Sequence, residues 1–268
     1  MKKKLLIAFI IASASSFLLA QEESSNEKFY FGIQADYLKW DAVLTSYSIN
    51  GESIPAEFVD LFNQQYSFLA NSHSYNIVFG YDILKNLCVL GRFGLNSIEH
   101  ESENDEIGEE SNNSIISNNP GFSGGMKIQY SFPIKNNLII RLEPSVLYKM
   151  TRDPHIVNDF ESFTFQDNSS MDLLSWKMGT TLSYILKEFE VFAGAAYFDF
   201  HKKLDYTQIS TDSFDNYVVE DKVLTFNSKS KVYGIAGFSI NLGNDKFFSL
   251  RANIGSGFLV CGTLMFKV

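Results

Sequence analysis

The sequence predicts an all-β fold, namely a closed antiparallel up-and-down transmembrane β-barrel of about ten strands, with eight as the alternative. Three observations lead to this prediction. Apolar and polar side chains alternate along many segments, short and long connections alternate between these segments, and an export signal precedes them. After that signal, no segment has the roughly 18 consecutive apolar residues that a transmembrane helix requires. Short turns are expected in the periplasm and long loops outside the cell.

The chain begins with MKKKLLIAFIIASASSFLLAQEES, in which three lysines precede an apolar run that ends in polar residues. This order is typical of a secretory signal peptide. We expect residues 1–20 to be the signal peptide, with cleavage after Ala20, and residues 21–268 to form the barrel domain. Cleavage after Ser16 and an uncleaved helical anchor are the alternatives.

The composition excludes some partners and favours strands. The formal net charge is −9, and removal of three lysines with residues 1–20 lowers it to −9 − 3 = −12. Such an acidic protein is not expected to bind nucleic acid. The 25 Phe and 13 Tyr residues favour strands with large apolar surfaces.

The segment GGMKIQYSFPIKNNLIIRLEPSVLYKM, residues 124–150, illustrates the alternation. Met126 and Ile128 alternate with Lys127 and Gln129, which is the two-residue period of a strand. The second half repeats the pattern after the turn IKNN, with apolar residues on one face and charged residues on the other. A water-soluble hairpin with one hydrated face would produce the same pattern. This segment alone therefore does not distinguish a soluble sheet from a membrane barrel, and the rest of the chain is needed.

The same pattern predicts ten strands along the chain, at residues 28–41, 70–84, 87–100, 120–133, 137–150, 171–186, 189–203, 229–242, 246–254 and 258–268. Most are long enough to cross a membrane at a tilt, which takes about 9 to 11 residues. The turns LKNL, IKNN, LKEF and GNDK are short, and the connections between them are long and polar, except at GSG near Gly255. This alternation of short and long connections places the two sets at opposite rims of a barrel.

Charged residues occupy the polar face of several predicted strands. A dry sandwich core would not tolerate them without partners, whereas a closed barrel can turn them toward a narrow lumen. The candidate lumen-lining charges are Asp36, Arg92, Lys127, Arg141, Glu143, Lys149, Lys177, Lys231 and Arg251, with Asp82 as a further inward candidate. We expect acids and bases to pair across strands, with Arg141 and Glu143 in one such ladder. A barrel of about ten strands is nearly filled by its side chains, so we expect a plugged or narrow lumen.

Aromatic residues occur near the ends of predicted strands. They include Phe29, Tyr30, Trp40, Tyr81, Tyr130, Phe132 and Tyr184. Aromatic side chains are favoured at the membrane interface. The alternative is that they end the core strands of a soluble β-sandwich.

With this pattern, the chain resembles the small bacterial outer-membrane β-barrel proteins, the opacity-protein-like and OmpA-like class. The resemblance covers nearly all of the chain after the signal. The ending CGTLMFKV resembles the last-strand signal that such proteins present to the barrel-assembly machinery, although the chain ends in Val268 and the aromatic residue is Phe266. The resemblance implies outer-membrane localisation, with lipid, lipopolysaccharide and the assembly machinery as partners.

Function is predicted to lie in the long loops. We expect a structural or surface-interaction role, of the adhesin kind, with an extracellular ligand bound through the loops and without a cofactor, a metal or catalysis. A narrow pore for small solutes is the alternative. A less favoured alternative rests on Asp199 and His201, whose Asp-x-His spacing resembles that of the omptin proteases, although the second, Asp-x-Asp pair of omptins is absent from the sequence.

Three further segments or residues carry expectations. The acidic segment at residues 100–110 is expected to be a solvated loop. Ile54, Phe58, Leu61 and Phe62 have helical spacing, so we expect a short amphipathic helix that packs against the loops of the barrel. Cys88 and Cys261 would face an oxidising compartment, and the sequence leaves open whether they pair.

Overall fold

The protein is described by a computed structural model of the 268-residue chain. The described residues are 28–104, 113–116, 120–152, 155–157, 164–165, 170–211, 217–243 and 245–267. The predicted signal peptide, residues 1–20, lies outside them, and so do residues 105–110 of the acidic segment.

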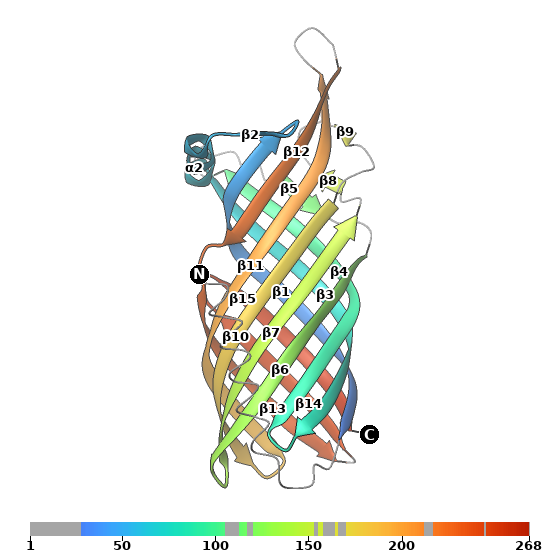
Figure 1. Ribbon diagram of the computed structural model, residues 1–268, viewed down its shortest axis with the longest axis vertical. Helices are drawn as coiled ribbons and strands as arrows, with labels where there is room; N and C mark the ends of the chain where they lie inside the picture. Colours follow the sequence, from blue (N-terminus) through green and yellow to red (C-terminus); the bar gives the residue numbers. More distant parts are fainter. Residues whose placement is uncertain are drawn as a thin grey trace.

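Ten long strands form a closed antiparallel ring in the described part of the chain (Figure 1). Each strand pairs with the next along the ring, and β15 pairs with β1 from Tyr30 and Lys267 to Trp40 and Gly257. Closure leaves this wall without a free edge. The strands are β1 (Phe29–Ile49), β3 (Tyr66–Leu84), β4 (Leu87–Asn104), β6 (Gly121–Lys135), β7 (Leu138–Arg152), β10 (Ser170–Leu186), β11 (Phe189–Thr211), β13 (Val232–Gly243), β14 (Lys246–Ile254) and β15 (Gly257–Lys267).

The predicted fold class is confirmed, and all ten predicted strands correspond to strands of the ring. The two rims also differ as predicted. Tight turns join β3 to β4, β6 to β7, β10 to β11 and β13 to β14 at one rim, where the strand ends Phe29 and Lys267 also lie. We call this rim the turn end and the opposite rim the loop end. β1, β3 and β11 are several residues longer at the loop end than predicted.

The wall has its apolar side chains on the outside. On β10, Leu174, Met178 and Leu182 are among the exposed side chains, and Trp176 is 47% exposed. Ser175, Thr181 and Ser183 alternate with them and are buried inside. This arrangement is the inverse of a water-soluble sandwich, and it places the apolar face where lipid would contact it. The outward face becomes polar toward the loop end, at Asp172 on β10 for example.

The structure adds β12 (Tyr217–Ser228) at the loop end, within a segment that the sequence analysis treated as an external loop. β12 pairs with β1 on one side and with β11 on the other. The hairpin of β14 and β15 ends early, so the extended parts of β1 and β11 would otherwise present unpaired edges there. Figure 1 shows β12 at this end, together with the short strands β2 (Glu52–Ser53), β5 (Asn113–Ile116), β8 (His155–Val157) and β9 (Thr164–Phe165).

The predicted amphipathic helix is present at the loop end as α2 (Ala56–Gln65). Val59 is buried and Phe62 packs against the core, but Phe58 and Leu61 are exposed at 54% and 49%. The packing of this helix against the barrel thus involves Val59 and Phe62, whereas Phe58 and Leu61 stay exposed. Of the helices in the described residues, none has both the length and the apolar character to span a membrane.

Candidate functional site in the barrel interior

The barrel interior has an apolar part toward the loop end and a polar part toward the turn end. We call the apolar part the plug. It consists of buried side chains from the strands β1, β3, β4, β10, β11, β12 and β13 and from the helix α2. They are Leu38, Trp40, Ala42, Leu44, Val59, Phe68, Ala70, Ile98, Met171, Leu173, Phe198, Phe200, Leu204, Phe226 and Tyr233.

Aromatic rings pack around Trp40 at the base of the plug. The Trp40 ring centroid lies 4.3 Å from that of Tyr233 and 4.5 Å from that of Phe198. The indole N–H donates a hydrogen bond of 2.7 Å to the Tyr233 hydroxyl, so its polar atom has a partner. Trp40 was expected at the membrane interface, and this expectation was wrong, because Trp40 has the same parity along β1 as the inward residues Asp36 and Leu38.

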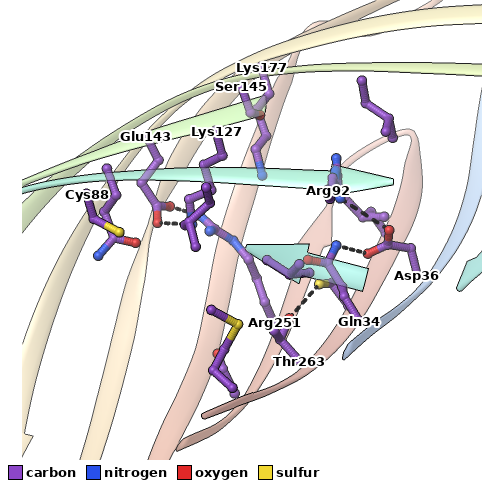
Figure 2. A pocket seen from close by; sticks show the side chains of 18 of the residues that line it. Gln34, Asp36, Cys88, Arg92, Lys127, Glu143, Ser145, Lys177, Arg251 and Thr263 are labelled. Carbon is purple, nitrogen blue, oxygen red and sulfur yellow. Dashed lines mark hydrogen bonds and ion pairs between the residues drawn. The ribbon is translucent and has the colours of Figure 1, made fainter. Parts of the chain in front are cut away.

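A cavity of about 490 Å³ occupies the polar part of the interior. It extends from Tyr30 and Met265 near the turn end to Leu38 and Phe198 at the base of the plug. Most of the candidate lumen charges line it, as does Asp82. These lumen charges are Asp36, Arg92, Lys127, Arg141, Glu143, Lys149, Lys177 and Arg251. Figure 2 shows several of these side chains directed into the shared space from different strands.

Asp36 on β1 is at the centre of one polar network. One carboxylate oxygen accepts hydrogen bonds from Ser74 at 3.1 Å and Asn76 at 3.2 Å, and it pairs with Arg92 at 3.2 Å. The other oxygen accepts a hydrogen bond of 2.7 Å from Gln34. Asp36 is buried, so these partners replace the water that a carboxylate would otherwise bind.

Glu143 on β7 is at the centre of a second cluster, in which basic residues predominate. Its carboxylate pairs with Lys127 at 2.6 Å and with the Arg251 guanidinium. Lys177 on β10 points into the cavity beside this cluster (Figure 2). The charged groups near the Lys177 ammonium are those of Arg251, Glu143, Lys127 and Arg92. Arg251 also lies over the Phe192 ring, 5.8 Å from its centroid.

Arg141 does not belong to one charge ladder with Glu143, as the sequence suggested. Its guanidinium forms a two-armed ion pair with Glu190 on β11 and donates a hydrogen bond of 2.8 Å to Ser183 on the intervening β10. Arg141 and Glu143 are therefore in separate clusters. Sequence reasoning missed Glu190, although its inward parity on the predicted strand at 189–203 was available as a signal.

The prediction that Lys231 lines the lumen was wrong. Lys231 is exposed and pairs with Asp199 at 2.9 Å, and Asp199 is on the outward face of β11. Lys231 stands one residue before β13 begins at Val232, so strand alternation does not fix its direction.

The contacts of Asp199 and His201 do not form the pair expected of a protease. Asp199 accepts a hydrogen bond from Lys231, and the His201 ring nitrogen contacts Asn227 at 3.1 Å. In the described part of the chain, no group of three or more His, Cys, Asp or Glu side chains is placed to hold a metal ion. Cys88 and Cys261 are both free thiols in the structure.

The comparisons with known proteins found similar chains among solved structures. No family model matches the chain, and no curated protein matches it. Among solved structures, the outer membrane protein OprG from Pseudomonas aeruginosa is similar over 90% of this chain and 95% of that chain, at 10% identity and a TM-score of 0.45. The translocator domain of the autotransporter NalP from Neisseria meningitidis is similar over 99% and 97% of the two chains, at 7% identity and a TM-score of 0.45.

Its closed ten-strand ring with an apolar outer face gives this chain the fold of a small outer-membrane β-barrel. A third similar structure is Ail, the attachment invasion locus protein of Yersinia pestis, at 8% identity and a TM-score of 0.26, over 90% of this chain and 99% of that chain. At such identities and scores, the similarity identifies no function, so the functional argument has to come from the plug, the cavity and the loop end.

Proposed function

We propose that this chain is an outer-membrane barrel with a surface-interaction role, which binds an external partner through its loop end. In this proposal the turn end faces the periplasm and the loop end faces outward. The chain would be exported by the signal at residues 1–20, inserted by the barrel-assembly machinery and surrounded by lipid and lipopolysaccharide.

The plug is the observation that carries this proposal. Trp40, Phe200 and Phe226 are almost fully buried, and they belong to three different strands, β1, β11 and β12. Strand side chains rather than a loop therefore fill the barrel at this level. Removal of such a plug would require repacking of the core, which is costly in a close-packed interior. A barrel closed in this way is better suited to a role at its outer surface than to transport.

The length of the loop end supports the same proposal. β11 has 23 residues, which at about 3.3 Å per residue extend about 75 Å along the strand. At a tilt of about 40°, this corresponds to roughly 57 Å of height, whereas the apolar band of such barrels is about 25 Å tall. The excess stands outside the membrane at the loop end, where α2 packs on β1 and β3 and its exposed Phe58 and Leu61 offer an apolar contact surface.

Adhesion of bacteria that display the protein tests this role. Cells that display the wild-type chain are expected to adhere to host-cell or matrix-coated surfaces above the level of cells without it. The double variant Phe58→Ser and Leu61→Ser removes the exposed apolar contact and is expected to lower adhesion at least fivefold. Glu57→Gln, on the same helix, is the control and is expected to keep wild-type adhesion. Adhesion by the wild type no higher than that of cells without the protein would contradict the role.

A narrow pore for small solutes is the second candidate, and the cavity of about 490 Å³ favours it. Conductance in planar bilayers distinguishes the two candidates. Because the plug closes one end of the cavity, the wild type is expected to stay at background current. Trp40→Ala removes the largest ring of the plug and is expected to raise the current. A steady single-channel current from the wild type would favour the pore instead.

A further inference from the structure

The cavity carries a net positive charge within an acidic protein. Six basic and four acidic side chains line it, so with lysines and arginines protonated the balance is 6 − 4 = +2. The whole chain, by contrast, has a formal net charge of −9. An unbalanced charge in a narrow interior requires hydration or a counter-ion.

The excess is concentrated at the Glu143 cluster. Asp36 has Arg92 as its basic partner, and Glu190 has Arg141. At Glu143, however, the three bases Lys127, Lys177 and Arg251 face a single carboxylate, which again leaves +2.

Lys177 has no ion-pair partner within the described residues. Glu143 already accepts from Lys127 and Arg251, and no carboxylate lies within 4.0 Å of the Lys177 ammonium in the part of the chain that the structure describes. Arg251 adds a second donor, because its buried Nε has no hydrogen-bond partner there. The cluster therefore has more hydrogen-bond donors than the acceptors within it can accommodate.

The strand register places these donors next to one another. Ser145 on β7 pairs with Lys127 on β6 and with Lys177 on β10, so the hydroxyl stands between two lysines on the inward face. Directly opposed residues on neighbouring strands have Cβ atoms about 5 Å apart, which is within reach of long side chains. On the same face, Gly179 has no side chain, and a Cβ atom there would lie 3.7 Å from the Arg251 guanidinium. The same Cβ atom would lie 3.3 Å from the Ile235 side chain, so glycine allows Ile235 and Arg251 to pack closely at this position.

We infer that this cavity binds a phosphate or sulfate group, held by Lys177, Lys127 and Arg251, with Ser145 as an additional hydrogen-bond donor. Such a group carries up to two negative charges and several acceptor oxygens, which match the two uncompensated positive charges and the free donors. The group enters from the turn end, because the plug closes the opposite end. The cavity volume admits either the free anion or a small molecule that carries the group.

This site is independent of the proposed surface role, because it lies at the other end of the interior from α2. Loss of adhesion in a Phe58 and Leu61 variant would leave anion binding unchanged. Conversely, a Lys177 variant is expected to adhere as the wild type does.

Titration calorimetry of the full-length folded protein in detergent micelles tests the inference. Inorganic phosphate, inorganic sulfate and glycerol 3-phosphate are titrated separately at constant ionic strength, with sodium chloride as the balancing salt. The wild type is expected to bind at least one of them saturably, with one site per chain. Tighter binding of glycerol 3-phosphate would identify a small phosphorylated molecule as the ligand, and tighter binding of phosphate or sulfate would identify the free anion.

Three lysine variants locate the site. Lys177→Gln is expected to weaken binding at least tenfold, and Lys177→Arg is expected to restore it to within a few-fold of the wild type. Lys203→Gln removes the same charge from an exposed position at the loop end and is expected to bind as the wild type does. The heat-dependent gel shift confirms that each variant is folded. Absence of saturable binding to the wild type, equal binding by Lys177→Gln, or an equal loss in Lys203→Gln would overturn the inference.

Discussion

Glu143 illustrates how individual charged residues are accommodated inside this barrel. Its side chain is 5% exposed and is held between Lys127 and Arg251. Removal of one partner from a buried ion pair leaves the other charge uncompensated, which costs far more than the pair itself contributes. The polar face of each strand is therefore stable only while its partners on other strands are in place.

Glu143→Gln is expected to destabilise the folded barrel by about 3 kcal/mol, toward the lower end of the loss for a broken buried pair because Lys127 remains partly hydrated in the cavity. The measurement is urea unfolding in lipid vesicles, followed by tryptophan fluorescence. Asp205→Asn is the matched control, because it breaks the exposed pair with Lys203. The control is expected to change the unfolding free energy by less than about 1 kcal/mol. Equal effects of the two variants would show that the Glu143 cluster has no structural role.

At this scale, the sequence predicts the direction of a side chain better than its partner. Strand alternation placed Asp36 and Lys149 correctly toward the interior. It could not identify Glu190 as the partner of Arg141, because that contact passes across β10 and depends on how three strands are staggered. The prediction for Lys231 was wrong for a different reason. Side chains alternate between the two faces only within a strand, and Lys231 precedes β13.

Among the elements, α2 is attached to the barrel through a mimic of strand pairing. The pairing of β1 with β3 ends at Ala42 and Phe68, so the next backbone groups of β1 lack a strand partner on that side. The Asn63 side chain supplies one, because its amide accepts a hydrogen bond from the Leu44 N–H at 2.9 Å and donates one to the Leu44 C=O at 2.8 Å. Asn63 thus holds the helix against the wall.

Asn63→Ala is expected to release α2 from β1, since the loss of both hydrogen bonds leaves buried backbone groups unsatisfied at a cost of about 1 to 3 kcal/mol. Limited proteolysis of the protein in vesicles measures this release as faster cleavage within residues 50–66. Gln64→Ala changes an exposed neighbour on the same helix and is expected to keep the wild-type cleavage rate. If Asn63→Ala is cleaved no faster than Gln64→Ala, the helix is held by its apolar contacts alone.

The elements that the sequence did not predict lie at the loop end. Within β12, Val223, Leu224, Thr225 and Phe226 do not alternate clearly between apolar and polar, so the period that identified the ten ring strands gives no signal. What determines β12 is tertiary, namely the two edges left by the short hairpin of β14 and β15. The local sequence of β12 therefore does not predict this strand, because the two edges that it pairs with become apparent only when the barrel strands are placed.

For the whole molecule, one arrangement accounts for the fold, the plug and the cavity. Apolar side chains face outward over the ring, polar side chains face inward, and the interior is closed toward the loop end and polar toward the turn end. The sequence was sufficient to predict the number of strands and the orientation of their side chains, with the apolar face outward and the polar face inward. It predicted a plugged or narrow lumen but not which residues form the plug, because inward apolar residues such as Leu38 and Phe198 cannot be distinguished from lipid-facing ones until parity is assigned along the whole strand.

The central claim is that lipid contacts the outer face of the barrel wall, whereas the side chains of the plug lie inside the barrel. The chain has two tryptophans that report on these two environments, since Trp176 is on the outer face and Trp40 is in the plug. The most direct measurement is tryptophan fluorescence of Trp40→Phe and Trp176→Phe in vesicles made with brominated lipids, which quench only nearby rings. The account predicts strong quenching in Trp40→Phe, which retains Trp176, and much weaker quenching in Trp176→Phe, which retains Trp40. No quenching of Trp176, or equal quenching of both rings, would contradict it.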